Sequence, residues 1–232
     1  MVGSLGDGAA WSLQAQKTIW AGEGGVLATS IQDLYERALL LGHFNLRALQ
    51  EIPQSSPNFA TAFTGTGLKY RAHPLGLALA LPQIKTVDEL IEGRHKAAAV
   101  LSDALAAIPG AELVQNEQPG MLHGYYALVA LINPAACGFD REAFTLAMHA
   151  ENIRTVSIPR QMNSMSQYPA FRQSGPGGPP VRAGRIATSQ RITAAAVKFF
   201  VPATPADLTG DTSVTVVADA IHKVAAGLPG RR

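Results

Sequence analysis

The residues best suited to chemistry lie near the start of the chain, between Ser12 and Gly25. Ser12 is followed by Lys17 and then by the run Gly22–Gly25, which reads Gly-Glu-Gly-Gly. A lysine amine is a nucleophile toward an aldehyde, and a serine hydroxyl can form a hydrogen bond with a phosphate oxygen. The glycine run favours a tight turn, and the apolar run 25–29 after it has the pattern of a strand. The spacing predicts a lysine held near a rigid turn, beside a serine that can bind phosphate.

The same residues have a simpler interpretation. Most lysines are solvated surface charges, and a Gly-Glu-Gly-Gly turn occurs for purely conformational reasons. The residues alone therefore leave open whether Lys17 reacts or only faces water.

Several motifs resemble one family. The first segment is similar to the motif Ser-Phe-x-x-x-Lys-x-x-x-x-Gly-Glu-Gly-Gly of the DegT/DnrJ/StrS aminotransferases, with Leu13 in place of the aromatic residue. Residues 67–71 (Gly-Leu-Lys-Tyr-Arg) resemble the family's Gly-x-Asn-x-Arg, with Lys69 in place of asparagine. Residues 2–7, 79–94, 123–126 and 139–141 also follow the family, so the likeness runs in order along nearly the whole chain.

The resemblance implies an enzyme that depends on pyridoxal 5′-phosphate (PLP). Lys17 would hold the cofactor as a Schiff base and later act as the base that moves the substrate proton. Ser12 would bind the cofactor phosphate. Lys69 and Arg71 would reach across a dimer interface toward the phosphate of the neighbouring subunit. Because Lys69 departs from the family pattern, it is either a phosphate ligand or a surface lysine.

The resemblance also implies a reaction class. We expect transamination of a keto-sugar, a keto-cyclitol or a related small ketone, with glutamate or glutamine as amino donor. Natural-product biosynthesis is the expected setting. Some relatives use the same cofactor for dehydration, so the cofactor is more firmly implied than the reaction.

Whole family members carry an N-terminal half that has no counterpart in these residues. That half supplies a phosphate-binding turn, an aromatic that stacks on the cofactor ring, and an aspartate that pairs with the ring nitrogen. Asp7 is the only acidic residue before Lys17, and it does not stand at the pairing position. Three alternatives follow: a split enzyme completed by a separately encoded N-terminal-half chain, a non-catalytic or regulatory subunit that pairs with a DegT-type partner, and a fragment of an ordinary transaminase.

The expected fold is α/β, the PLP-dependent transferase fold type I. Residues 1–72 would be the remnant of an incomplete large PLP-binding domain. Residues 73–232 would be a connecting helix and a small C-terminal α/β domain.

The local pattern predicts individual elements within this frame. Helices are expected over 31–41, capped by Ser30, from Pro74 with a kink or restart at Pro82, over 87–108, over 140–151, and from Asp211. The first helix would bury Leu34, Ala38 and Leu41. Strands are expected over 25–29, 111–114, 124–132, 153–158 and 197–201. Residues 43–66 read as irregular, and residues 173–184 as a Gly/Pro-rich loop.

Composition excludes several classes of protein. The chain has 232 residues, 47% of them apolar and 16% charged, and a net charge of +2. No dense basic run suggests nucleic acid as a partner. The single cysteine, Cys137, excludes an internal disulfide and fits the cytoplasm. No signal peptide or apolar run long enough for a membrane span is visible, and the six histidines show no ligand spacing.

Overall fold

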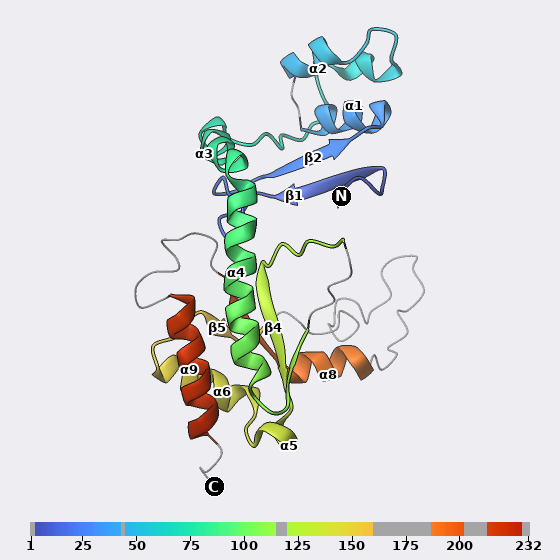
Figure 1. The fold of residues 1–232 in the computed structure, drawn as a ribbon. Coiled ribbons are helices and arrows are strands. Elements are labelled where there is room, and N and C mark those ends of the chain that lie inside the picture. The colour runs from blue at the N-terminus through green and yellow to red at the C-terminus, as the bar shows by residue number, and fades with distance from the viewer. Residues whose placement is uncertain (1–2, 43–44, 115–119, 160–186, 202–212, 229–232) are drawn as a thin grey trace. The chain divides into compact units, whose positions relative to one another are not determined.

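The computed structural model describes residues 3–42, 45–114, 120–159, 187–201 and 213–228 (Figure 1). The chain divides into two compact units, Met1–Val87 and Asp88–Arg232. The expected assignment of residues 1–72 to a large-domain remnant and of residues 73–232 to a connecting helix and small domain stays a prediction.

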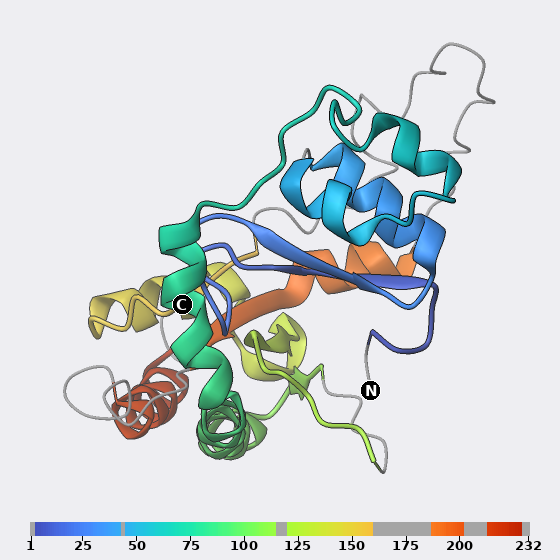
Figure 2. The same cartoon turned by 90° about the horizontal axis from the view of Figure 1, so that it is seen from above.

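The first unit begins with a two-stranded antiparallel sheet. Strand β1 (Gly8–Ser12) pairs with β2 (Gly25–Thr29), so that Ser12 lies opposite Gly25 (Figures 1 and 2). The prediction of β2 is confirmed, whereas β1 was not predicted. The pairing makes residues 13–24, which include Lys17, the connection of a hairpin.

Three short helices follow the hairpin: α1 (Gln32–Leu41), α2 (Asn45–Glu51) and the 3₁₀ helix η1 (Pro57–Thr61). The prediction that residues 43–66 are irregular is therefore wrong. The helices share a small apolar cluster, formed by Leu39, Leu40, Ala48, Ile52 and Ala62 with Tyr35 and Phe59 at its edge. Short helices form when tertiary contacts cover an apolar face, because a few turns alone are marginal in water.

Two details of α1 differ from expectation. The residue that caps the helix is Ile31, not Ser30, and its backbone N–H donates to Thr29 Oγ1 at 3.1 Å. The buried face carries Glu36, Leu39 and Leu40, while Leu41 is exposed. These residues are buried because α2 and η1 pack against this side of α1.

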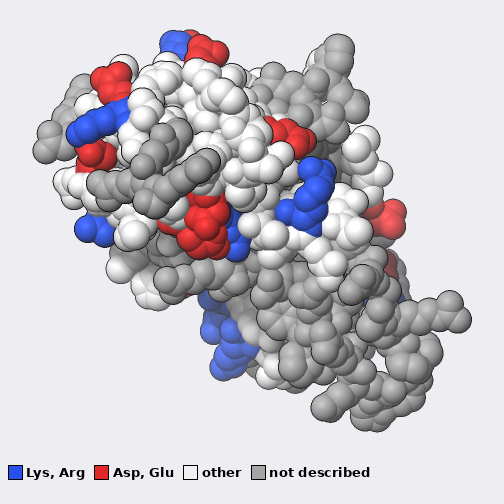
Figure 3. Space-filling view, turned by 90° about the horizontal axis from the view of Figure 1, so that it is seen from below, with Lys and Arg blue, Asp and Glu red and all other residues white. Residues whose placement is uncertain are grey.

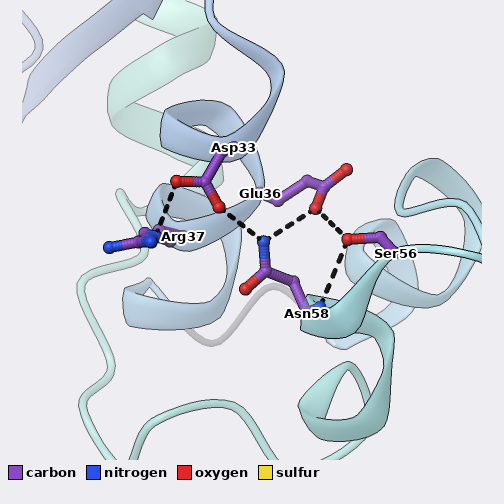
Figure 4. A network of polar contacts seen from close by, with 5 residues as sticks. All are labelled: Asp33, Glu36, Arg37, Ser56 and Asn58. Carbon is purple, nitrogen blue, oxygen red and sulfur yellow. Dashed lines mark hydrogen bonds and ion pairs between the residues drawn. The ribbon is translucent and has the colours of Figure 1, made fainter.

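Glu36 is a buried carboxylate within this group of helices (Figure 4). It accepts hydrogen bonds from Ser56 Oγ at 2.5 Å, Asn58 Nδ2 at 2.8 Å and Gln32 Nε2 at 2.9 Å. These donors, with Ser56 the largest contribution, hold the pKa of Glu36 below its usual range. The carboxylate therefore joins α1 to η1 as a satisfied polar contact.

The first unit ends with α3 (Pro74–Lys85). His73 caps the helix, since its Nδ1 accepts the backbone N–H of Leu75 at 3.2 Å, and Pro74 occupies the first turn as expected. The helix continues through Pro82 to Lys85 without a restart. Only one helical donor is lost at a proline, and Gln83 Nε2 adds a side-chain bond to the Leu79 carbonyl at 2.7 Å.

The second unit is built on a four-stranded antiparallel sheet with the order β3-β4-β6-β5. Its strands are β3 (Ala111–Leu113), β4 (Ala127–Ile132), β5 (Val156–Ser157) and β6 (Ala196–Phe200). Its helices are α4 (Val87–Ala106), α5 (Pro134–Cys137), α6 (Arg141–Ala150), α8 (Ala187–Ala195) and α9 (Val214–Gly227). All four strands match predicted ones, while α5 and α8 were not predicted.

The core of this unit lies between the sheet and α4, α6 and α9, which gather on one face of it (Figure 2). Leu128 lies opposite Phe199 and Ala130 opposite Val197, so these four side chains share a face, and all are buried. The largest helical contributions are Leu101 and Leu105 from α4, Phe144 and Met148 from α6, and Ile221 from α9. The predicted apolar positions of α9 pack as expected, as do those from Ala98 onward in the α4 segment, whereas Val87, Leu90 and Ile91 are only half-buried and lie outside this core.

Asp140 caps α6, as predicted, by accepting the backbone N–H of Ala143 at 2.7 Å. Helix α9 is capped by Ser213, which accepts from Val216 at 3.3 Å. The expected cap Asp211 and the Gly/Pro-rich loop 173–184 lie outside the described residues. Within the described ranges, no helix combines the length and the apolar character that a bilayer span requires.

Candidate functional site

Lys17 lies in the connection between β1 and β2, and backbone hydrogen bonds hold this connection in a closed shape. Leu13 N–H donates to the Gly24 carbonyl at 2.9 Å, and Ala21 N–H donates to the Leu13 carbonyl at 2.8 Å. Lys17 N–H donates to the Gln14 carbonyl at 2.9 Å. We call residues 13–24 the lysine loop. The Lys17 side chain is half-buried, so its amine sits on an ordered backbone rather than on a freely solvated helix face.

Ser12 stands at the entrance of the lysine loop, as the last residue of β1. Its Oγ accepts the backbone N–H of Gln14 at 3.2 Å, and the residue is exposed. A hydroxyl group has one donor and two acceptor positions, so this contact leaves the O–H able to donate to an anion.

An apolar contact holds the lysine loop against α3. Leu13 and Ala21 from the loop are buried with Ala80 from the helix, and Ile19 packs beside them. Gly76 of α3 faces the carbonyl oxygen of Ala21, and a Cβ at position 76 would lie only 2.6 Å from that oxygen. The missing side chain at Gly76 is what permits this approach.

A polar contact joins the same two segments. Trp20 N–H donates to Gln83 Oε1 at 3.1 Å, and Gln83 Nε2 donates to the Trp20 carbonyl at 2.9 Å. The amide of Gln83 thus satisfies both backbone groups of a residue three positions beyond Lys17. No polar side chain stands between Pro74 and Pro82, and Gln83 is the first to follow, but nothing in the sequence indicates which segment this amide contacts.

The predicted phosphate ligands Lys69 and Arg71 are exposed and lie in the segment between η1 and α3. This segment passes the glycine turn, because a Cβ built at Gly24 would contact the Cβ of Ala72 at 3.7 Å. Gly24 has a φ of +135°, a conformation that suits glycine. The structure therefore brings the Lys69–Arg71 segment beside the end of the lysine loop, from more than forty positions away in sequence.

Two other residues near the lysine loop take ordinary roles. Trp20 is 43% exposed, so its side chain is not packed in the interior of the unit. The backbone carbonyl of Asp7 accepts the Thr29 hydroxyl at 2.5 Å. Among the described residues, no group of three or more histidine, cysteine, aspartate or glutamate side chains is arranged to hold a metal ion.

Among the described residues, basic and acidic side chains lie next to one another in several places on the face shown in Figure 3. Lys96 pairs with Glu92 at 2.6 Å, and this partner holds the pKa of Glu92 below its usual range. Burial raises the pKa of the Cys137 thiol. A buried thiol with a raised pKa is a poor nucleophile, so Cys137 does not compete with Lys17 for a reactive role.

Comparison with known proteins gives the family. Residues 1–222 match the DegT/DnrJ/EryC1/StrS aminotransferase family. A Streptomyces kanamyceticus protein named as an L-glutamine:3-amino-2,3-dideoxy-scyllo-inosose aminotransferase is 31% identical over 156 residues, which cover 66% of this chain and 35% of that protein. The spore coat polysaccharide biosynthesis protein SpsC of Bacillus subtilis is 29% identical over 157 residues, covering 67% of this chain and 40% of SpsC.

Solved structures give the fold. DesI, crystallised in the presence of its TDP-sugar product, superposes with a TM-score of 0.71 at 22% identity, over 98% of this chain and 52% of DesI. An E. coli GDP-4-keto-6-deoxy-D-mannose-3-dehydratase with bound hydrated PLP superposes with a TM-score of 0.76 at 14% identity, over 97% of this chain and 56% of the dehydratase. The predicted α/β fold, that of fold type I, is thereby confirmed over about half of each solved chain.

The chain spans 35–40% of the length of the curated relatives named above and about half of the matched solved chains. The family match runs through the lysine loop, α3 and most of the second unit. The chain belongs to the DegT/DnrJ/EryC1/StrS family of PLP-dependent aminotransferases.

Proposed function

We propose that this chain is one subunit of a split PLP-dependent aminotransferase, with Lys17 as its reactive residue. The observation that carries the proposal is the lysine loop, which holds a half-buried lysine on a backbone fixed by its own hydrogen bonds and by α3. The expected acceptor is a keto-sugar, a keto-cyclitol or a related small ketone. The relative named for glutamine-dependent transamination of an aminocyclitol ketone supports this class and favours glutamine or glutamate as donor.

The residues of the first unit fit the chemical groups of PLP. An amine suits its aldehyde, and a hydroxyl with cationic side chains suits its phosphate. Lys17 would hold the cofactor covalently through its ε-amine. Ser12 would donate its O–H to the phosphate, and Lys69 and Arg71, both exposed, would contact the phosphate of a neighbouring subunit. The expected acidic partner of the ring nitrogen would come from an N-terminal half.

Each group would act in a definite way during turnover. Bound PLP supplies an electron-accepting ring that makes the bond between the amino donor's α-carbon and hydrogen acidic. The freed ε-amine of Lys17 would take that proton and deliver it to the carbon that was the cofactor's aldehyde, on the other side of the amino nitrogen. The hydrogen bonds within the lysine loop would keep the amine in place, so that no rearrangement is needed during the transfer.

The apolar surface of the first unit supports a partner chain. Large apolar side chains exposed by about 40% or more occur on β1, β2 and α3: Trp11, Val26, Leu27, Leu75, Leu77, Leu79, Leu81 and Ile84. A two-stranded sheet is marginal by itself, and strands apolar on both faces are typical of the interior of larger sheets. We propose that a separately encoded chain with the family's N-terminal half covers this surface, as a cytoplasmic hetero-oligomer.

The test is to follow PLP binding by visible absorbance, with this chain alone and after co-expression with the product of a neighbouring gene. Borohydride reduction and peptide mapping then identify the lysine that carries the cofactor. We expect a yellow complex labelled at Lys17, and none with Lys17→Ala, while the matched surface variant Lys96→Ala keeps the label. A label on the partner's own lysine would instead favour a regulatory subunit.

A further inference from the structure

We propose that Gln83 is a positioning residue that fixes the direction of Lys17 by clamping the lysine loop onto α3. The proposal rests on the proposed function insofar as Lys17 is the reacting amine. The clamp itself is a feature of the first unit, since both segments belong to it.

The side-chain amide of Gln83 replaces a missing strand partner for Trp20. It accepts the Trp20 N–H at 3.1 Å and donates to the Trp20 carbonyl at 2.9 Å. This is the pair of contacts that a neighbouring strand would offer to one residue. Trp20 lies three residues beyond Lys17, so fixing its peptide groups fixes the path on which the lysine side chain is carried.

The orientation of the Gln83 amide is itself determined. Nε2 also donates to the Leu79 carbonyl at 2.7 Å, one turn earlier in α3. The NH₂ group therefore meets two carbonyl oxygens, and Oε1 meets one N–H. Reversing the amide would set an oxygen against two oxygens and an NH₂ against an N–H, so only one orientation satisfies the contacts.

Two further contacts show that the lysine loop is docked and not merely close. Leu13 and Ala21 are buried against Ala80, and Gly76 leaves room for the Ala21 carbonyl. The apolar contact holds the two ends of the loop near the helix. The Gln83 contact is the directional part, because hydrogen bonds set orientation whereas apolar packing does not.

The first experiment compares amide hydrogen exchange of peptides from residues 13–24 in the wild type, Gln83→Leu and Gln83→Glu. We expect exchange at Trp20 to rise about fivefold in Gln83→Leu, the factor that the loss of one ordinary hydrogen bond gives. Gln32→Leu is the control, because it removes a side-chain bond to Glu36 in the same unit and leaves the lysine loop untouched. Wild-type exchange in Gln83→Leu would overturn the proposal.

Gln83→Glu separates the polar clamp from packing, since it keeps the shape of the side chain. An ionised carboxylate can accept from Trp20 N–H, but its second oxygen would face the carbonyls of Trp20 and Leu79. We expect this variant to exchange as fast as Gln83→Leu near neutral pH. When acid protonates the carboxyl group and restores a donor, the exchange rate of Gln83→Glu should fall toward that of the wild type measured at the same pH. If the exchange rate of Gln83→Glu relative to the wild type were the same at neutral and at acidic pH, the hydrogen-bond mechanism would be contradicted.

The second experiment links the clamp to Lys17. Pyridoxal phosphate and borohydride are applied to the chain in its complex, and the rate of modification at Lys17 is divided by that at Lys96 in the same chain. We expect this ratio to fall about tenfold in Gln83→Leu, since a small misplacement of a reacting group costs rate steeply. An unchanged ratio with faster exchange would overturn the positioning role. If the wild-type chain were modified no faster at Lys17 than at Lys96, the proposed function would be contradicted. The hydrogen-exchange experiment would still test whether Gln83 holds the lysine loop on α3.

Discussion

Gly76 lies in the first turn of α3, where alanine is ordinarily the better helix former. We predict that Gly76→Ala nonetheless destabilises the first unit by about 1–3 kcal/mol, since the added Cβ would lie 2.6 Å from the Ala21 carbonyl oxygen and must displace the lysine loop. Urea unfolding followed by tryptophan fluorescence measures this change, because Trp11 and Trp20 both lie in that unit.

Gly227→Ala is the matched control for this substitution. Gly227 is the last residue of α9, and a Cβ there would meet no atom within 4 Å. We expect a neutral or slightly stabilising effect there, measured by circular dichroism because both tryptophans lie in the other unit. Equal effects at positions 76 and 227 would contradict the close contact between α3 and the lysine loop.

Glu36 gives the first unit a dependence on acid. Hydrogen bonds from Ser56, Asn58 and Gln32 favour the ionised carboxylate, so the pKa of the folded state lies below the unfolded value. A carboxyl with a lowered pKa stabilises the fold above its unfolded pKa, near 4.5, and loses that contribution as the pH falls through the folded pKa. We predict that the wild type loses stability over this acidic range.

The variant Glu36→Gln isolates this term. It should be less stable than the wild type near pH 7, because its NH₂ group would face donors, and the difference should shrink as the pH is lowered below about 4. Thermal unfolding at several pH values measures the difference. A gap between the two proteins that stays constant from pH 7 to pH 3 would show that the carboxylate charge is not involved.

At the residue level, a motif in the sequence singles out Lys17 and Ser12 as candidates, and their roles stay predictions. It could not predict the Gln83 contact, which joins residues 63 positions apart. Nor could it predict that Glu36 is buried, because a carboxylate is expected at the surface unless its donors are known. Two of the three donors, Ser56 and Asn58, belong to η1 and its cap, which the sequence pattern did not reveal.

At the level of elements, the cap of α6 offers a direct test. Asp140 accepts the Ala143 N–H at 2.7 Å and adds negative charge at the helix N-terminus. We predict that Asp140→Ala destabilises the second unit by about 1 kcal/mol, whereas Asp140→Asn, which also caps well, costs less. Denaturant unfolding monitored by circular dichroism compares the two. An alanine variant as stable as the asparagine variant would mean that the cap contributes little.

The elements that the sequence predicted well are those whose apolar residues pack within one unit along a regular repeat. Helix α9 buries Val217, Ala220, Ile221 and Val224 as its spacing indicated. Strand β1 escaped prediction because its short run of small residues becomes a strand only by pairing with β2. Helix α2 escaped for a related reason, since its burial depends on contacts with α1.

For the whole molecule, the two units differ in how much of its own apolar surface each one buries. The second unit buries the inward faces of its sheet and of three helices in one continuous core. The first unit has two small clusters and leaves most of α3 exposed, although α3 is apolar around nearly its whole circumference. A helix that is apolar on all sides is normally buried, so the exposed surface of α3 is the surface that the proposed partner chain would cover.

This difference predicts which substitutions disturb assembly. Leu75 on α3 and Leu146 on α6 are both leucines on helices, and both are 71% exposed. If the complementary chain covers α3, Leu75→Glu loses the burial of a leucine and places a charge in the contact. We predict that the Kd of the complex rises by on the order of 30- to 100-fold, equivalent to about 2–3 kcal/mol.

Leu146→Glu should leave that Kd unchanged, because α6 belongs to the unit that already has a complete core. Analytical ultracentrifugation of the co-expressed pair measures both variants, with circular dichroism to verify that each still folds. The contrast between them matters more than either value, since both introduce the same charge at the same exposure. If only Leu146→Glu weakened the complex, the partner would bind the second unit. The first unit would then not be completed by the partner chain.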